Sequence, residues 1–164
     1  MIKIIYVLLV ALCLLWAQIP LNPEPIGHLP LWAGCEIGFG DVDNDGYLDL
    51  AATWASGVIG PSRIFKNQNG VFDTVPYWQS PNTHSTGLAF GDVDNDGDLD
   101  LAVGNFAMLG ERCMLYRNND GVIEPRPCWI SDAYGGSWVG FGDVDNDGDL
   151  DLAAVDMFQF PCVF

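Results

Sequence analysis

One acidic segment occurs three times in this chain at a fixed spacing, and no other feature constrains the fold as strongly. The copies are FGDVDNDGYLDLAATW from Phe39, FGDVDNDGDLDLAVGN from Phe90 and FGDVDNDGDLDLAAVD from Phe141, so the period is 51 residues. A weaker similarity has the same offset, because RIFKNQNGVFDTVPYW from Arg63 matches MLYRNNDGVIEPRPCW from Met114. A repeat of this size is one structural unit that cannot bury its apolar faces alone. The chain must therefore fold by stacking such units.

Each unit predicts four short strands, which in the first copy are 36–40, 48–53, 63–66 and 71–77. The pairs Asn69-Gly70 and Asp120-Gly121 are hairpin signals between the third and fourth strands, and no long helical pattern is present. Repeats of this length with four strands indicate an all-β fold of β-propeller blades, each of four antiparallel strands. The chain holds about two and a half such blades and so an incomplete ring. The predicted divisions are 18–38 for a linker and lead-in strand, 39–89 for repeat 1, 90–140 for repeat 2 and 141–164 for a partial repeat 3.

The N-terminus predicts export from the cytoplasm. Lys3 precedes an apolar run from Ile4 to Ala17, after which the chain becomes polar and rich in proline. A run of about 14 apolar residues is short for a bilayer span and fits a secretory signal peptide over 1–17. An uncleaved membrane anchor remains the alternative. We expect a secreted, extracellular or cell-surface protein, with the periplasm as a further possibility.

The composition favours a folded and strongly acidic protein. The sequence has 22 acidic and 6 basic residues, a formal net charge of -16, 12% aromatic and 49% hydrophobic residues. Such a chain can bury a core, unlike a disordered acidic tail. Nucleic acid is excluded as a partner because the chain has no basic stripe for phosphates.

The acidic residues gather in the repeated segment with the spacing D-x-D-x-D-G-x-x-D. Carboxylates at positions 1, 3, 5 and 9 of a tight turn are the oxygen ligands that Ca²⁺ prefers, and position 7 is expected to add a backbone carbonyl. The side chain at position 7 is then free to vary, as Tyr47 indicates. An EF-hand is disfavoured because Ala52, Val103 and Ala154 stand where its bidentate glutamate would be. Acidic turns that merely solubilise the sheet remain the alternative, although four carboxylates in one turn would repel each other without a cation.

From Phe39 to the C-terminus, the chain resembles the FG-GAP or VCBS-type repeats of propellers similar to the integrin α-subunit. The resemblance lies in these loops, in their Phe-Gly lead-ins and in the segments RIFKNQNG and LYRNNDG. The resemblance implies about three Ca²⁺ sites, and related propellers usually close with about seven blades. This chain therefore needs further blades or further copies to close a ring. The implied ligands, of which Tyr47, Asp98 and Asp149 act through carbonyls, are Asp41, Asp43, Asp45, Tyr47 and Asp49, then Asp92, Asp94, Asp96, Asp98 and Asp100, then Asp143, Asp145, Asp147, Asp149 and Asp151.

The cysteines say less about the fold than the acidic loops do. Cys35, Cys113, Cys128 and Cys162 remain after the signal peptide, and Cys113 and Cys128 flank the turn at Asp120. A disulfide between these two is the first expectation, and buried thiols are an equal alternative. No C-x-x-C pattern supports zinc or redox chemistry.

No motif indicates catalysis, since a G-x-S-x-G elbow is absent and a saturated Ca²⁺ is a poor Lewis acid. We therefore expect a binding or adhesion module for an extracellular protein or carbohydrate, with Ca²⁺ stabilising the blades. An accessory propeller of a polysaccharide-active enzyme and a purely structural array are the alternatives. We expect side chains that could contact a ligand in two sets of loops, those before the first strands and those between the second and third strands. Packing between blades is the alternative role for these side chains. They are Trp32, His84 and Tyr134 in the former loops, and Trp54, Asn105 and Phe106 in the latter.

Overall fold

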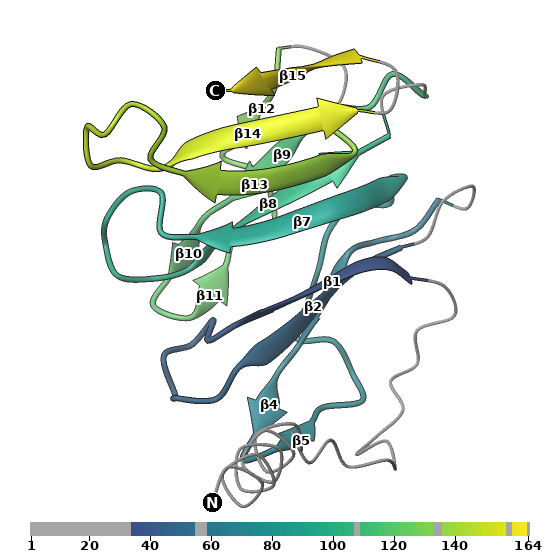
Figure 1. The fold of residues 1–164 in the computed structure, drawn as a ribbon. Helices are drawn as coiled ribbons and strands as arrows, with labels where there is room; N and C mark the ends of the chain where they lie inside the picture. Colours follow the sequence, from purple (N-terminus) through teal and green to yellow (C-terminus); the bar gives the residue numbers. More distant parts are fainter. Residues whose placement is uncertain (1–33, 55–58, 107–108, 133–135, 157–158, 164) are drawn as a thin grey trace, which may run out of the picture.

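The structure is a computed structural model, and it describes residues 34–54, 59–106, 109–132, 136–156 and 159–163. The predicted signal peptide and most of the predicted linker lie outside these residues. The described residues form antiparallel sheets and no α-helix, which confirms the predicted all-β class (Figure 1). None of them forms a helix long and apolar enough to cross a membrane.

Two four-stranded sheets have the same topology, and we call them blade 1 and blade 2. In each, the first, second and third strands are antiparallel neighbours and a short fourth strand pairs with the third. Blade 1 consists of β1 (Gly34–Gly40), β2 (Asp49–Trp54), β3 (Arg63–Phe65) and β6 (Trp78–Gln79). Blade 2 consists of β7 (Ser85–Gly91), β8 (Asp100–Asn105), β9 (Met114–Tyr116) and β12 (Trp129–Ile130).

The third sheet, blade 3, consists of β13 (Trp138–Gly142), β14 (Asp151–Asp156) and β15 (Gln159–Val163). The sequence predicted a partial repeat over 141–164, and the structure shows three paired strands in it. Ala153 pairs with Val163, whereas the equivalent Ala102 pairs with Leu115. The third strand of blade 3 therefore lies three residues earlier in the sequence than the repeat period predicts, because the connection between its second and third strands is shorter.

Small hairpins extend the third strands of blades 1 and 2. The turns have positive φ at both central residues, 56° and 90° at Asn69 and Gly70, and 52° and 79° at Asp120 and Gly121. These values belong to the tight turn that the Asn-Gly and Asp-Gly pairs predict. The hairpin strands are β4 (Asn67–Gln68) with β5 (Val71–Phe72), and β10 (Asn118–Asn119) with β11 (Val122–Ile123).

The predicted fourth strand over 71–77 was wrong in its extent. Only 71–72 pair with β4, and the strand that pairs with β3 is β6 at 78–79. Pro76 lies in the segment between them, where its missing amide cannot join a ladder. The chain bends there before it returns to the sheet.

The core lies between blades. Its central cluster combines residues of blade 1 with residues of blade 2, and Figure 1 shows β1, β7 and β13 side by side. Each sheet is therefore buried by its neighbour, as expected for a repeat. The buried members are Val42, Ala51, Ile64, Trp78, Leu88, Leu101, Val103, Tyr116 and Ile123.

The expected disulfide between Cys113 and Cys128 does not form. The amide of Ser131 donates to the Cys113 carbonyl, and the amide of Cys128 donates to the Leu115 carbonyl, so the two cysteines are not opposite each other. Cys113 is buried and Cys128 is exposed. Their thiols donate instead to the carbonyls of Gly136 and Leu115.

Candidate metal centre

Each acidic loop joins the first strand of a blade to the second. The fourth residue of each loop has positive φ, at 56° for Asn44, 58° for Asn95 and 62° for Asn146. Asparagine tolerates this region better than most residues. The sixth residue is a glycine in all three loops, with φ of 90°, 97° and 100°. The three loops therefore share one backbone shape, which the repeated DVDNDG sequence explains.

The first aspartate of each loop accepts two backbone amides. In the first loop, Asp41 Oδ1 lies 3.0 Å from the Asp45 nitrogen and Oδ2 lies 2.9 Å from the Gly46 nitrogen. The same pair of bonds recurs at Asp92 and at Asp143. These bonds bend the chain back over the first carboxylate and bring the later aspartates toward it.

Carboxylates converge in all three loops. Among the described residues, the groups whose ligand atoms lie within 4.8 Å of one another are Asp41, Asp43 and Asp45, then Asp92, Asp94 and Asp96, then Asp143, Asp145 and Asp151. Three carboxylates this close repel each other strongly, and their oxygens suit a hard cation.

A buried orphan atom supports this fit in the first loop. Asp43 Oδ1 is buried and has no hydrogen-bond partner, while Oδ2 pairs with the ammonium group of Lys66. A buried carboxylate oxygen without a partner is costly. Ca²⁺ in the first loop would satisfy this atom, so the residues present fit the cation.

The aspartate at the ninth position holds backbone amides in the first two loops. Both oxygens of Asp49 accept backbone amides, from Val42 at 3.2 Å and from Asn67 at 2.7 Å, and Asp100 repeats this arrangement. Burial raises the pKa of both carboxyls, and these amides oppose the rise. The two aspartates anchor the loop to the end of the third strand and do not join the converging group. Only Asp151 joins the group in its loop.

The seventh position also has a role that the sequence did not reveal. Its side chain was expected to be free, but Asp98 Oδ1 accepts the side-chain amide of Asn44 at 2.7 Å, and Asp149 Oδ1 accepts that of Asn95 at 2.8 Å. The loops of blades 1 and 2 are thus each bonded to the loop of the following blade. Tyr47 is the exception, and its hydroxyl bonds to Asn69 Oδ1 at 3.1 Å.

Basic side chains accompany the third position, and sequence reasoning missed them. Lys66 pairs with Asp43, and Arg117 pairs with Asp94 at 3.0 Å. Both basic residues follow the third strand and lie one repeat period apart, which is a signal that the sequence contained. They partly neutralise the loops, although partly exposed pairs of this kind contribute little stability.

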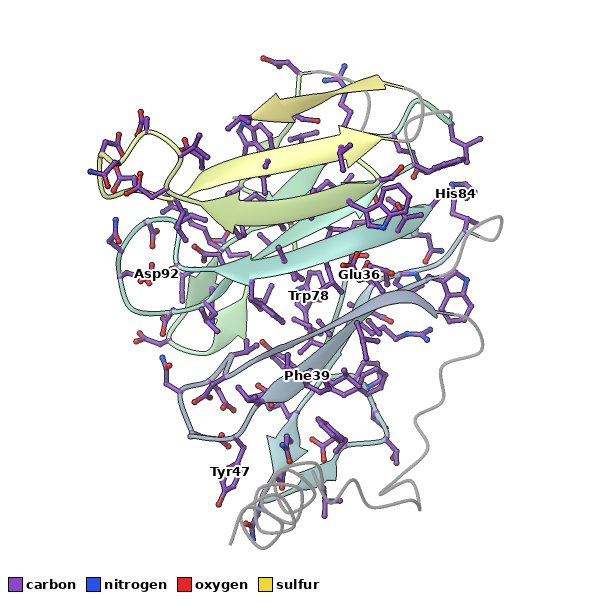
Figure 2. All side chains as sticks on the ribbon, in the orientation of Figure 1. Glu36, Phe39, Tyr47, Trp78, His84 and Asp92 are labelled. Carbon is purple, nitrogen blue, oxygen red and sulfur yellow. The ribbon has the colours of Figure 1, made fainter. Side chains whose placement is uncertain are left out.

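The described ligand candidates lie at the opposite end of the blades. Figure 2 shows His84 and Asp92 at opposite ends of the sheets. His84 pairs with Glu111, with 2.9 Å between Nδ1 and Oε1, and its carbonyl accepts the amide of Phe106. Trp32 and Tyr134 lie outside the described residues.

Two of these candidates are placed differently from the prediction. Trp54 and Asn105 end strands β2 and β8 and do not lie in loops. Asn105 is fully buried, and its side-chain amide donates to the Arg112 carbonyl, so no ligand can reach it. Trp54 lies beneath the guanidinium of Arg63, 4.8 Å from the ring centre, so this ring has a packing role. His84 and Phe106 remain partly accessible.

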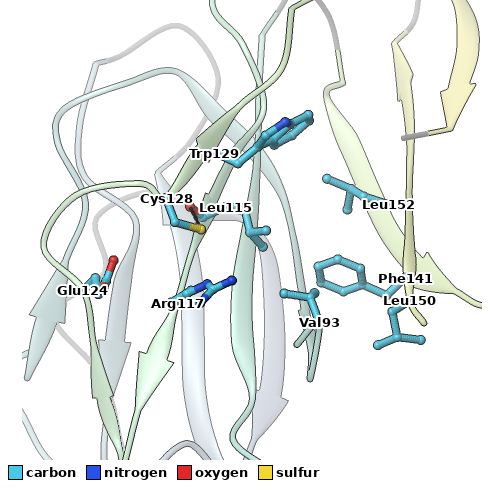
Figure 3. A pocket seen from close by; sticks show the side chains of 9 residues that line it. All are labelled: Val93, Leu115, Arg117, Glu124, Cys128, Trp129, Phe141, Leu150 and Leu152. Atoms are coloured by element: carbon cyan, nitrogen blue, oxygen red, sulfur yellow. Dashed lines mark hydrogen bonds between the residues drawn. The ribbon is translucent and has the colours of Figure 1, made fainter. Parts of the chain in front are cut away.

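A cavity of about 610 Å³ opens between blades 2 and 3, and Figure 3 shows its lining. Trp129 of blade 2 lies on one side and Phe141 of blade 3 on the other. At the equivalent place between blades 1 and 2, Trp78 packs edge-on against Tyr116 with 4.9 Å between ring centres. Among the described residues, blade 3 supplies no counterpart of Tyr116. The cavity therefore lies at the outer half of the interface between blades 2 and 3.

Comparison with known proteins identifies a family. Residues 41–103 match a model described as an FG-GAP-like repeat, and residues 85–122 match a model described as an FG-GAP repeat. Together the matches run from 41 to 122, half of the chain. No curated protein matches. Repeats of this family are typically non-catalytic binding or structural modules of extracellular or surface proteins. The matched segments are the loops and sheets described above, so the chain belongs to the FG-GAP repeat family and forms part of a β-propeller.

Proposed function

We propose that this protein is a secreted calcium-binding propeller module whose three acidic loops hold Ca²⁺ for structural reasons. The observation that supports this most directly is the orphaned and buried Asp43 Oδ1, in a loop where Asp41 and Asp45 offer further oxygens. Repetition of the same backbone shape in the other two loops supports two more sites. Bound Ca²⁺ would supply charge neutralisation and oxygen coordination there.

The position of the loops favours a stabilising role over a catalytic one. Each loop connects two neighbouring strands, and the aspartates at its ends already hold backbone amides, as Asp41 and Asp49 do. A cation that joins the loop only in the folded state adds its binding free energy to the stability of the blade.

Ligand binding is proposed for the rim opposite the loops. His84 and Phe106 lie together there, joined through the His84 carbonyl, and the Glu111 carboxylate fixes the imidazole. A partly exposed ring beside a fixed polar group suits stacking against a sugar or contact with a protein loop. A glycan array probed with wild-type protein and with Phe106→Ala tests this, since glycan signals that both proteins give equally would contradict a role for this rim.

Secretion is proposed from Lys3 and the apolar run that follows it. N-terminal sequencing of the protein recovered from the medium of a secreting host tests this part. A mature N-terminus at Gln18 is expected, and retention of the protein in the cell with Met1 intact would contradict it.

Thermal unfolding tests the calcium proposal. For the secreted chain, excess Ca²⁺ should raise the melting temperature relative to chelator. Asp92→Asn should reduce this calcium-dependent rise, because Asp92 both shapes its loop and offers a ligand oxygen. Asp132→Asn, an exposed aspartate outside the loops, is the matched control and should leave the rise unchanged. An identical melt with Ca²⁺ and with chelator would refute the proposal.

A further inference from the structure

The interface between blades 1 and 2 has a defined set of contacts near the first strand of each blade, β1 and β7, which we call the inner strands. A Cβ on Gly40 would lie 2.9 Å from the Phe90 ring and 3.1 Å from Leu99, so the glycine makes room for these side chains. Beside them, Asn44 donates to Asp98. We call the side with the glycine and asparagine the leading face, and the side with the phenylalanine, leucine and aspartate the trailing face.

The interface between blades 2 and 3 repeats this set. A Cβ on Gly91 would lie 2.7 Å from the Phe141 ring and 3.0 Å from Leu150, and Asn95 donates to Asp149 at 2.8 Å. Two independent interfaces in one chain therefore define what a leading face accepts.

Blade 3 carries a complete leading face with no described residue against it. A Cβ added at Gly140 or at Gly142 would meet nothing within 4 Å. Val144 is 66% exposed, whereas its equivalent Val42 is 0% exposed beneath blade 2. Asn146 has the same left-handed backbone as Asn44 and Asn95.

Blade 1 carries a trailing face that is open near its inner strand. Ile37, Phe39 and Leu48 are 57%, 54% and 56% exposed, and they correspond to Leu88, Phe90 and Leu99. Further out, Leu50 and Phe65 are already buried. The one departure from the trailing set is Tyr47, which stands where Asp98 and Asp149 stand in the other blades.

We propose that the leading face of blade 3 binds the trailing face of blade 1 in a second copy of this chain. Phe39 and Leu48 of one copy would lie over Gly142 of the other, as Phe90 and Leu99 lie over Gly40. The contact repeats the blade order already present within the chain, and blade 1 carries the trailing side chains that such a contact needs, so the occupant that we propose is a second copy. Because the two faces differ, the association is head to tail and each copy keeps one open face.

Tyr47 makes this contact weaker than the interfaces within the chain. Asn146 finds no aspartate at the seventh position of the second copy, whereas Asn44 and Asn95 each bond to one. The proposed contact is also limited to the half of the face near the inner strands. We therefore expect reversible association that depends on protein concentration.

Sedimentation equilibrium of the secreted chain in Ca²⁺, with two blocking variants, tests the arrangement. Gly142→Phe fills the open leading face, and Phe39→Glu or Leu48→Glu places a charge on the trailing face. Each variant alone should be monomeric, and an equimolar mixture of Gly142→Phe with Leu48→Glu should form a heterodimer and nothing larger. Val122→Glu, at an exposed site on blade 2, should associate like wild type. Circular dichroism spectra that match wild type show that each variant is folded.

A second test measures whether one substitution strengthens the association between copies. Tyr47→Asp supplies the missing carboxylate and should tighten association roughly tenfold, since a hydrogen bond to a charged group is worth about that factor. Asn146→Ala in the same chain should remove this gain. A wild-type chain that stays monomeric at every concentration overturns the proposal, even if Tyr47→Asp associates, because the face would then accept only blades with that aspartate. A mixture of the blocked variants that stays monomeric overturns it as well. Neither outcome bears on calcium binding, which the melting experiment tests separately.

Discussion

The first and third acidic loops have the same FGDVDNDG sequence and the same local shape but different surroundings. The φ angles are 56° at Asn44 and 62° at Asn146, and the first aspartate accepts the glycine amide at 2.9 Å in one loop and 3.1 Å in the other. The second residue, however, is fully buried as Val42 and mostly exposed as Val144. The loop conformation is therefore encoded within the loop, whereas burial depends on the next blade.

Blade 2 covers the first loop in a specific way. The side-chain amide of Asn118 donates to the Val42 carbonyl at 2.7 Å, and a Cβ on Gly121 would lie 2.8 Å from the Asp43 Cβ. The hairpin of one blade thus closes over the acidic loop of the preceding blade. In a repeat protein this is how nearest-neighbour interfaces supply stability that no single unit has.

A charge placed under the covered loop should give the largest difference between the two regions. Val42→Asp buries a carboxylate in the core and should destabilise the protein by about 3 kcal/mol or more. Val144→Asp places the same group in solvent and should change stability by less than about 0.5 kcal/mol. Urea unfolding in Ca²⁺ measures both. Equal losses would show that the two loops do not differ in burial.

Filling the glycine positions should give a smaller contrast. Gly40→Leu forces a side chain against Phe90 and Leu99, and overpacking of this kind destabilises by about 1 to 3 kcal/mol. Gly142→Leu meets open space and should be nearly neutral in dilute protein. Denaturant midpoints of the two variants give the comparison. If Gly142→Leu were as harmful as Gly40→Leu, something would already cover blade 3.

The asparagine pair isolates one hydrogen bond. Asn44→Ala and Asn146→Ala both place alanine at positive φ, so the backbone penalty is common to both variants. Only Asn44→Ala also removes a bond to a carboxylate, that of Asp98, and it should be destabilising by about 1.5 kcal/mol more. Thermal unfolding at low protein concentration checks the difference. Identical losses would indicate that the bond between blades contributes nothing.

Much of the fold could be predicted because its signals are local. The repeat period, the two hairpin turns and the acidic loops each depend on residues close in sequence, and the structure confirms the first two strands and the hairpin turn of blades 1 and 2. The extent of the fourth strand was missed because the hairpin and Pro76 interrupt the ladder. The third strand of blade 3 was missed because its connection departs from the period.

The contacts around the candidate site were harder to predict. The bond from Asn44 to Asp98 joins residues 54 positions apart, and nothing in either loop indicates it. The same holds for the amides that occupy Asp49, one of which comes from Asn67 after the third strand. Sequence spacing identified the carboxylates, but the neighbours that share their oxygens come from the next strand or the next blade.

Calcium titration by calorimetry on residues 18–164 tests the central claim most directly. If the three acidic loops hold the ion, the titration should show about three sites, with dissociation constants of roughly 10⁻⁶ to 10⁻³ M, a range that runs from calcium sensors to extracellular modules. Asp43→Asn should remove one site and Asp132→Asn none. A titration with no saturable calcium binding would contradict the account and leave the loops as acidic turns between the strands of each blade.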